Sequence, residues 1–199
     1  KIVLGVTGGI AVYKAVDLVS KLRKQGAQVR VVMTEHAQQF VTPLTFKEIS
    51  GNAVATSMWN SNQEFNVEHI ALANWADVFV VAPATANILA KMAHGLADDL
   101  LSTTLLAAQA PIIVCPAMNT GMYDNRVTQE NIASLQAYGL TVMPPATGFL
   151  ACGTSGAGRL PEPLEIVDFV KGFFAKRCGD MQNLRVLVTA AGTREPIDP

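Results

Sequence analysis

The sequence has few of the features that would tie it to a membrane, to nucleic acid or to a disulfide framework. Its three cysteines are an odd number at distant positions with no Cys-x-x-Cys pair, so neither disulfides nor a zinc site are indicated. No apolar run reaches the roughly 20 residues that span a bilayer, and no signal-peptide layout precedes the first strand-like segment. The 15 basic and 16 acidic residues give a net charge of −1 and form no basic cluster. We therefore expect a cytoplasmic protein that binds neither membranes nor nucleic acid.

What the sequence does contain is a regular alternation of short strand-like and helical segments. At 199 residues and 50% hydrophobic content, it can bury one domain of about 150 to 180 residues but not two. The expected strands are near residues 2–7, 29–33, 78–82, 110–115 and 140–143, and the expected helices near 11–25, 42–49, 67–75, 86–94, 98–108, 128–138 and 164–176. This alternation predicts an α/β fold, a doubly wound parallel sheet of the Rossmann-like or flavodoxin-like three-layer class.

Two segments stand apart from this alternation. Residues 144–161 are rich in Gly, Pro, Thr and Ser and predict a loop of about 18 residues, a length typical of lids and binding loops. Residues 186–192 repeat the strand-to-glycine pattern of residues 3–9, which predicts the start of a second, nucleotide-type domain. We therefore divide the chain into a domain at 1–180 and a linker with a truncated second domain at 181–199. An added edge strand in the first domain is the alternative.

Residues 116–122 (Pro-Ala-Met-Asn-Thr-Gly-Met) place a carboxamide between two thioethers directly after a buried strand. Ligands of parallel sheets gather at the carboxyl ends of the strands. Asn119 can donate and accept at once, so it suits a carboxylate, an amide or a flavin edge, while Met118 and Met122 offer adaptable apolar walls. A turn Asn flanked by core methionines is the alternative.

The glycine pair Gly8–Gly9 lies between the first strand and the first helix, where the backbone can approach an anion at a helix N-terminus. Neither the G-x-G-x-x-G fingerprint nor a P-loop is present. Thr34 occupies the place where a dinucleotide site would have an acid, so a mononucleotide such as FMN fits better than NAD. A plain Gly-Gly turn is the alternative.

After the third strand, Thr85 and Asn87 bring a hydroxyl and a carboxamide to the same edge of the sheet, where they could hold another part of one ligand. An ordinary Thr N-cap would explain Thr85 equally well. His69, near a helix start, could act as a base, although a satisfied, half-buried histidine is the alternative. Cys152 lies in a glycine-rich segment that could close over a ligand, whereas Cys115 is expected in a strand core.

Five motifs in this order resemble the flavin-dependent cysteine decarboxylases. They are residues 7–11, 69–70, 82–87, 116–122 and 151–153. More narrowly, the sequence is similar to the phosphopantothenoylcysteine decarboxylases that form one half of bacterial bifunctional coenzyme A biosynthesis flavoproteins. The tail 188–199 resembles the opening of the other half, the ligase that joins cysteine to phosphopantothenate.

The resemblance implies FMN as cofactor and decarboxylation of 4′-phosphopantothenoylcysteine to 4′-phosphopantetheine and CO2 in coenzyme A biosynthesis. The substrate's CH2–SH would be oxidised to a thioaldehyde, CO2 would leave to give an enethiol, and re-reduction would give the thiol. The resemblance also implies trimers, often four of them in a dodecamer. Ligase activity is not expected from this chain, since only the opening of that half is present.

The resemblance also assigns roles to residues. His69 would act in the oxidative half of the reaction, Asn119 would hold the substrate carboxylate, and Cys152 would donate the final proton. The residues expected to contact FMN are Gly8, Gly9, Ile10, Thr34, Thr85, Ala86, Asn87 and Ala117. Those expected to contact the substrate are Asn119, Met122, Ala151 and Arg159, and no metal is expected. Asn74 stands where relatives often have a basic residue, so Arg159 or Lys14 could replace a phosphate contact there.

Two other functions fit parts of the pattern. One is a related flavoenzyme acting on a peptide C-terminal cysteine or transferring a prenyl group to a flavin, and the ligase-like tail argues against both. The other is a non-catalytic, FMN-binding regulatory module. Such modules carry long acidic or low-complexity extensions, and this sequence has none.

Overall fold

A parallel sheet organises the protein. The computed structural model describes residues 1–59, 68–149, 153 and 155–178. Its six-stranded sheet has the order β3-β2-β1-β4-β5-β6, with every neighbouring pair parallel. The strands are β1 (Ile2–Val6), β2 (Val29–Met33), β3 (Val54–Ala55), β4 (Val78–Ala84), β5 (Ile112–Pro116) and β6 (Thr141–Val142). A separate antiparallel hairpin consists of β7 (Ala146–Phe149) and β8 (Ser155–Arg159).

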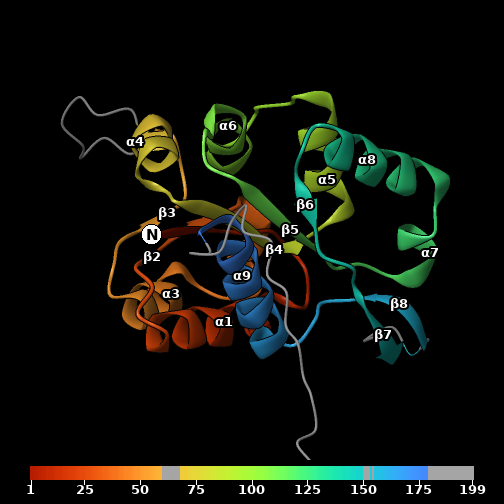
Figure 1. Cartoon of the computed structure of the whole chain (residues 1–199), viewed down its shortest axis with the longest axis horizontal. Helices are drawn as coiled ribbons and strands as arrows, with labels where there is room; N and C mark the ends of the chain where they lie inside the picture. Colours follow the sequence, from red (N-terminus) through yellow and green to blue (C-terminus); the bar gives the residue numbers. More distant parts are fainter. Residues whose placement is uncertain (60–67, 150–152, 154, 179–199) are drawn as a thin grey trace, which may run out of the picture.

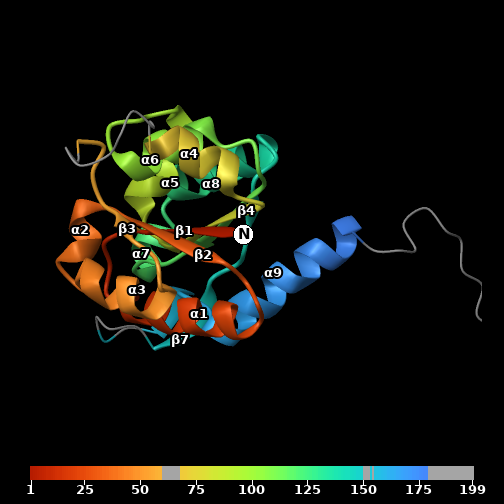
Figure 2. The same ribbon diagram turned by 90° about the vertical axis from the view of Figure 1, so that its left-hand side faces the viewer.

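Helices cover both faces of this sheet. They are α1 (Val12–Lys24), α2 (Glu35–Gln38), α3 (Pro43–Ser50), α4 (Glu68–Trp75), α5 (Ala86–His94), α6 (Leu100–Ala107), α7 (Thr120–Tyr123), α8 (Arg126–Ala137) and α9 (Pro163–Cys178). Figures 1 and 2 show α1, α3 and α9 on one face and α4, α5, α6 and α8 on the other. The predicted doubly wound, three-layer fold is confirmed. Among the described helices, none combines the length and the apolar character needed to cross a membrane.

β1 shows why both faces of the sheet are covered. Its alternate residues Ile2, Leu4 and Val6 belong to the core cluster shared with α1 and α9. Val3 belongs to the cluster on the opposite face, shared with helices α4, α5, α6 and α8. A strand that is apolar at every position is typical of a parallel sheet buried between two helical layers.

Two local predictions are wrong. Pro83 does not end the strand that precedes it, because β4 continues to Ala84. Its pairing with β5 shifts register between Val81 and Ala84, and such an irregularity is where a strand tolerates a residue without an N–H donor. The stretch 144–161 is not one unstructured loop, because the β7–β8 hairpin lies within it. Its small residues and glycines have low strand propensity, so sequence pattern did not reveal the hairpin.

Cys115 lies in β5 with no exposed surface, as expected for a strand-core cysteine. Burial raises the pKa of its thiol to about 12, because the thiolate would lose its hydration. At pH 8 only about one such thiol in 10⁴ is ionised, and the thiolate is the form that reacts with alkylating reagents. The position therefore predicts an inert cysteine.

We expect iodoacetamide at pH 8 to leave Cys115 unmodified in the folded protein and to alkylate it fully in 6 M guanidinium. Peptide mass spectrometry of the two samples checks this, with the unfolded sample as the control. Rapid alkylation of Cys115 in the folded protein would contradict the buried position of β5.

Candidate active site

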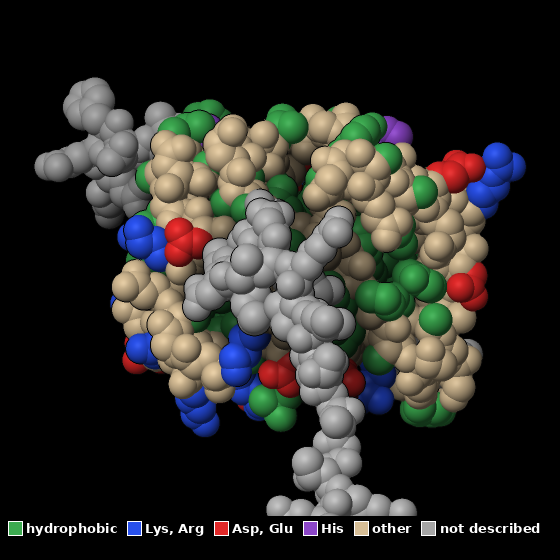
Figure 3. All heavy atoms as spheres, in the orientation of Figure 1, with side chains coloured by type: hydrophobic (Ala, Val, Ile, Leu, Met, Phe, Trp, Pro, Cys, Tyr) green, Lys and Arg blue, Asp and Glu red, His purple; other side chains and the backbone are tan. Residues whose placement is uncertain are grey.

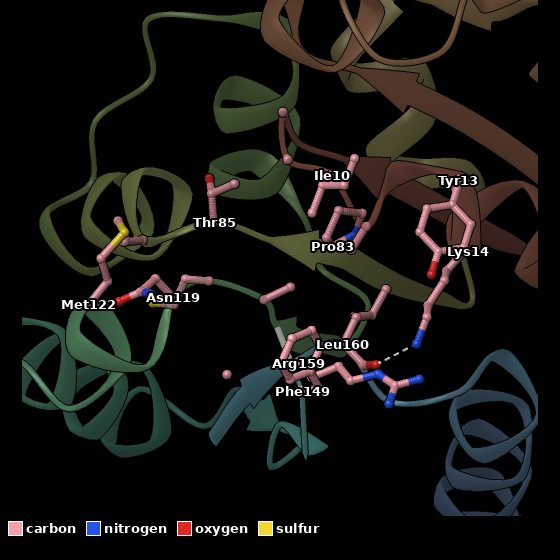
Figure 4. Close-up of a pocket in the computed structure, with 17 residues that line it drawn as sticks. Ile10, Tyr13, Lys14, Pro83, Thr85, Asn119, Met122, Phe149, Arg159 and Leu160 are labelled. Atoms are coloured by element: carbon pink, nitrogen blue, oxygen red, sulfur yellow. Dashed lines mark hydrogen bonds between the residues drawn. The ribbon is translucent and has the colours of Figure 1, made fainter. Parts of the chain in front are cut away.

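A cavity of about 400 Å³ opens at the carboxyl ends of β1, β4 and β5. The chain runs from β1 outward to β2 and β3, and then returns to place β4 on the other side of β1. Crevices at such a switch point are where doubly wound sheets bind ligands. The residues that line the cavity are Gly8, Gly9, Ile10, Ala11, Tyr13, Lys14, Pro83, Thr85, Ala86, Ala117, Met118, Asn119, Met122, Phe149, Gly158, Arg159 and Leu160 (Figure 4).

The loop between β1 and α1 forms one wall of the cavity. A Cβ atom on Gly8 would lie 2.4 Å from the Cβ of His36, so the close approach of α2 requires glycine there. α1 begins after Ala11, a residue whose side chain cannot cap the helix, and no acidic residue lies in its first turn. The N–H groups of Val12 and Lys14 donate to the carbonyl oxygens of Gly9 and Ala11, and the positive end of this 13-residue helix suits an anion.

Thr7 joins the ends of β1 and β4 beneath the cavity. Its buried hydroxyl donates to the carbonyl oxygen of Pro83 at 2.7 Å and accepts from the N–H of Thr85 at 3.1 Å. The Thr85 hydroxyl accepts from the N–H of Ile88 at 3.4 Å, so Thr85 is the N-cap of α5 and also part of the cavity wall. The N-cap reading of Thr85 is confirmed, and its contact with a ligand stays a prediction. Thr7 was missed as a positioning residue, although it precedes the glycine pair.

Asn119 lies at the opposite end of the cavity from Tyr13 and Lys14 (Figure 4). It is the N-cap of α7, and its Oδ1 accepts from the N–H of Gly121 at 2.8 Å. This bond holds the oxygen side of the carboxamide against the first turn of α7. Met118 and Met122 both line the cavity beside it, and their role as walls of a ligand site stays a prediction.

The β7–β8 hairpin closes a further side of the cavity and contacts the loop after β5. The N–H of Met118 donates to the carbonyl oxygen of Gly158 at 2.9 Å. Gly158 has a φ of +125°, and a Cβ atom there would lie only 2.3 Å from the oxygen of Met118. Phe149, in β7, is 70% exposed at the rim. It was missed from the sequence because a lone aromatic in a glycine-rich stretch carries no pattern.

Two cations and one carboxylate meet where β8 joins α9. Lys14 is buried, and its Nζ donates to the carbonyl oxygen of Leu160 at 3.1 Å and to Oε1 of Glu162 at 2.9 Å. Nη2 of Arg159 donates to the same oxygen of Glu162. The hydrogen bond from Lys14, together with both positive charges, lowers the pKa of Glu162. Lys14 and Arg159 line the cavity, whereas Glu162 does not.

The structure brings together most of the predicted site residues. Those that line the cavity are Gly8, Gly9, Ile10, Thr85, Ala86, Ala117, Asn119, Met122 and Arg159. Ala151 and Cys152 lie outside the described residues. In the described parts of the chain, no three His, Cys, Asp or Glu side chains cluster as metal ligands would.

Three predicted residues do not line the cavity. Thr34 is the N-cap of α2, where its hydroxyl accepts from the N–H of Ala37 at 3.3 Å. Asn87 is exposed in the first turn of α5. His69 is half-buried on α4, and no described residue of that helix lines the cavity. In Figure 1, α4 and the β7–β8 hairpin lie at opposite corners of the protein.

Comparison with known proteins places these features in context. The flavoprotein family model matches residues 1–175. The chain is 50% identical over 198 residues to the coenzyme A biosynthesis bifunctional protein CoaBC of Haemophilus influenzae, and 48% identical over 199 residues to that of Bacillus subtilis. Each alignment covers 100% of the chain and 49% of the relative. The chain therefore spans about half the length of these curated relatives.

Solved structures share the fold. A Cys-to-Ser variant of PPC decarboxylase, complexed with pantothenoylaminoethenethiol, matches with a TM-score of 0.78 and 35% identity, over 87% of this chain and 97% of that one. The FMN-dependent cysteine decarboxylase SpaF matches with a TM-score of 0.72 and 30% identity, over 86% and 97% of the two chains.

Proposed function

Because the chain belongs to the flavoprotein family, we propose that it binds FMN in the cavity at the switch point and decarboxylates 4′-phosphopantothenoylcysteine. The observation that carries the proposal is the shared cavity of the glycine pair Gly8–Gly9, the hydroxyl of Thr85 and the carboxamide of Asn119. The similarity to CoaBC proteins and to PPC decarboxylase supports this substrate, whose product is 4′-phosphopantetheine. We propose the cytoplasm as the location of the reaction.

The residues of the cavity fit FMN. The N-terminus of α1, without a side-chain cap or an acidic residue in its first turn, suits the phosphate. Gly8 and Gly9 line the cavity with backbone alone, and Ile10, Pro83 and Met118 offer apolar surface to a flat ring. When bound, FMN supplies two-electron oxidation of the substrate's CH2–SH group and returns the electrons after CO2 is lost.

The side chains of this chain would then hold the reacting groups. Asn119 donates a hydrogen bond to the substrate carboxylate from an amide group that the Gly121 N–H holds in place. The methionines beside it exclude water from the carbon that loses CO2. Cys152 would donate the final proton, a role that the sequence predicts and that lies outside the described residues.

The proposed assembly also accounts for His69. We propose that the chain forms trimers, with four trimers in a dodecamer, and that His69 acts in the cavity of a neighbouring copy. Support comes from its position, because α4 lies on the far side of the sheet from α1 and none of its described residues lines the chain's own cavity. The second half of the full-length protein would be the ligase, which residues 181–199 would begin.

The visible spectrum and product analysis test the function. We expect a yellow protein that releases CO2 from 4′-phosphopantothenoylcysteine, and a Cys152→Ser variant that accumulates the oxidised enethiol. A colourless protein that does not gain flavin absorbance when FMN is added would contradict the proposed function. A yellow but inert protein would favour the alternatives, a cysteine-peptide decarboxylase or a regulatory module.

A mixed-oligomer experiment tests the role of His69. We expect His69→Asn and Asn119→Asp each to be inactive alone, and differently tagged, co-expressed mixtures of the two to recover part of the activity. Recovery follows because the cavity of a His69→Asn copy keeps Asn119 and can receive His69 from its neighbour. If His69 acted within its own chain, every site in the mixture would lack one group and the mixture would stay inactive.

A further inference from the structure

We infer that Lys14 and Arg159 form a subsite for a phosphate monoester, and that this subsite binds the phosphate of the substrate. The inference rests on the proposed function for the identity of that substrate. It starts from the charges around the cavity. Of the described residues that line it, Lys14 and Arg159 are the only charged ones, and both are cations.

The carboxylate nearby does not cancel this charge. Glu162 neutralises one of the two cations, and it lies outside the cavity wall with 52% of its side chain exposed. A single oxygen, Oε1, accepts from both partners. The cluster therefore carries a net charge of about +1, and both of its cationic residues line the cavity, an arrangement that attracts an anion with more than one negative charge.

The two cations have different freedom. The Lys14 side chain is only 7% exposed, and its Nζ donates to the carbonyl oxygen of Leu160 (Figure 4). The same nitrogen also donates to Glu162. Arg159 is 42% exposed, and one nitrogen of its guanidinium contacts Glu162. Guanidinium has five N–H donors in a fork that matches phosphate, so Arg159 can bind a phosphate while Lys14 supplies fixed charge beside it.

The position of the cluster suits a ligand with two anionic ends. In Figure 4, Asn119 and Met122 lie on one side of the cavity and Lys14 on the other. A substrate whose carboxylate meets Asn119 would direct its remaining length toward this second end. The cofactor also carries a phosphate, but the uncapped N-terminus of α1 and the glycine pair already suit that group. The substrate phosphate is therefore the one assigned to Lys14 and Arg159.

The test compares 4′-phosphopantothenoylcysteine with pantothenoylcysteine, which lacks the phosphate. We expect Arg159→Gln to lower the ratio of kcat/KM for the two compounds by about 10- to 100-fold, as expected for charge-assisted hydrogen bonds. Arg159→Lys, which keeps the charge but loses the fork, should lower it less. The matched control is Arg126→Gln, since Arg126 also pairs with a glutamate, Glu130, but on the exposed surface of α8. It should leave the ratio unchanged.

Each other outcome has a distinct meaning. An equal fall for both compounds would mean that Arg159 only supports the hairpin, and would overturn the subsite. Weaker binding of FMN by Arg159→Gln, with riboflavin binding unchanged, would assign the subsite to the cofactor and overturn its assignment to the substrate. If the wild type processes neither compound, the proposed function fails. In that case the affinities of the two compounds are measured by calorimetry. The subsite is supported only if the wild type binds the phosphorylated compound more tightly and Arg159→Gln removes that difference.

Discussion

Asn119→Asp is expected to lower kcat/KM for decarboxylation by about 10²- to 10³-fold while leaving the protein folded. The variant keeps an oxygen that can accept from the N–H of Gly121, and Asp caps helices as well as Asn does. It loses the amide donor and places a negative charge against the substrate carboxylate. A lost hydrogen bond to a charged group and this repulsion together cost about 3 to 4 kcal/mol in the transition state, which gives that rate loss.

Asn125→Asp provides the matched control. Asn125 is also an N-cap whose Oδ1 accepts from the N–H two residues later, at 2.9 Å from Val127, but it does not line the cavity. Its kcat/KM should stay within about twofold of the wild type, as expected for a surface change. Circular dichroism and flavin content of both variants check the fold. An Asn119→Asp variant with nearly normal kcat/KM would show that this carboxamide does not hold the carboxylate.

The fold could be predicted because its signals are local. β1 and β5 are short apolar runs bounded by Gly, Pro or polar residues. A chain with that pattern can bury both faces of a sheet only between two layers of helices. The residues after these strands could be predicted for the same reason. Parallel strands bring their carboxyl ends to one edge, so Gly8, Thr85 and Asn119 had to lie near one another.

Other parts of the site depend on contacts between distant segments. Lys14 and Glu162 are 148 positions apart, and in the sequence Lys14 is an ordinary residue of an amphipathic helix. The β7–β8 hairpin is held against the loop after β5 by backbone groups, which leave no pattern in side chains. His69 could be identified as a candidate base, but one chain does not show which cavity it serves.

The backbone contact between that hairpin and Met118 leads to the second large effect, which we expect from Gly158→Ala. The added Cβ would meet the oxygen of Met118 at 2.3 Å, and the φ of +125° is one that L-residues rarely adopt. Overpacking costs about 1 to 3 kcal/mol and the strained backbone about 1 to 2 more. We therefore expect the free energy of unfolding to fall by about 2 to 5 kcal/mol, or β8 to move away from Met118.

Either response would also lower the activity, because Gly158, Arg159 and Leu160 all line the cavity. A displacement of about 1 Å there is enough to lower kcat/KM roughly 10²-fold.

The matched control is Gly139→Ala. Gly139 also has a positive φ, +88°, but nothing lies within 4 Å of an added Cβ, and the residue lies between α8 and β6. It should cost only the backbone strain, about 1 to 2 kcal/mol, and keep its activity. Urea unfolding, flavin content and kcat/KM separate the two variants. If Gly158→Ala behaved like Gly139→Ala, the hairpin would not pack on the β5–α7 loop as closely as this, and the wall of the cavity that carries Arg159 would be free to move independently of Asn119.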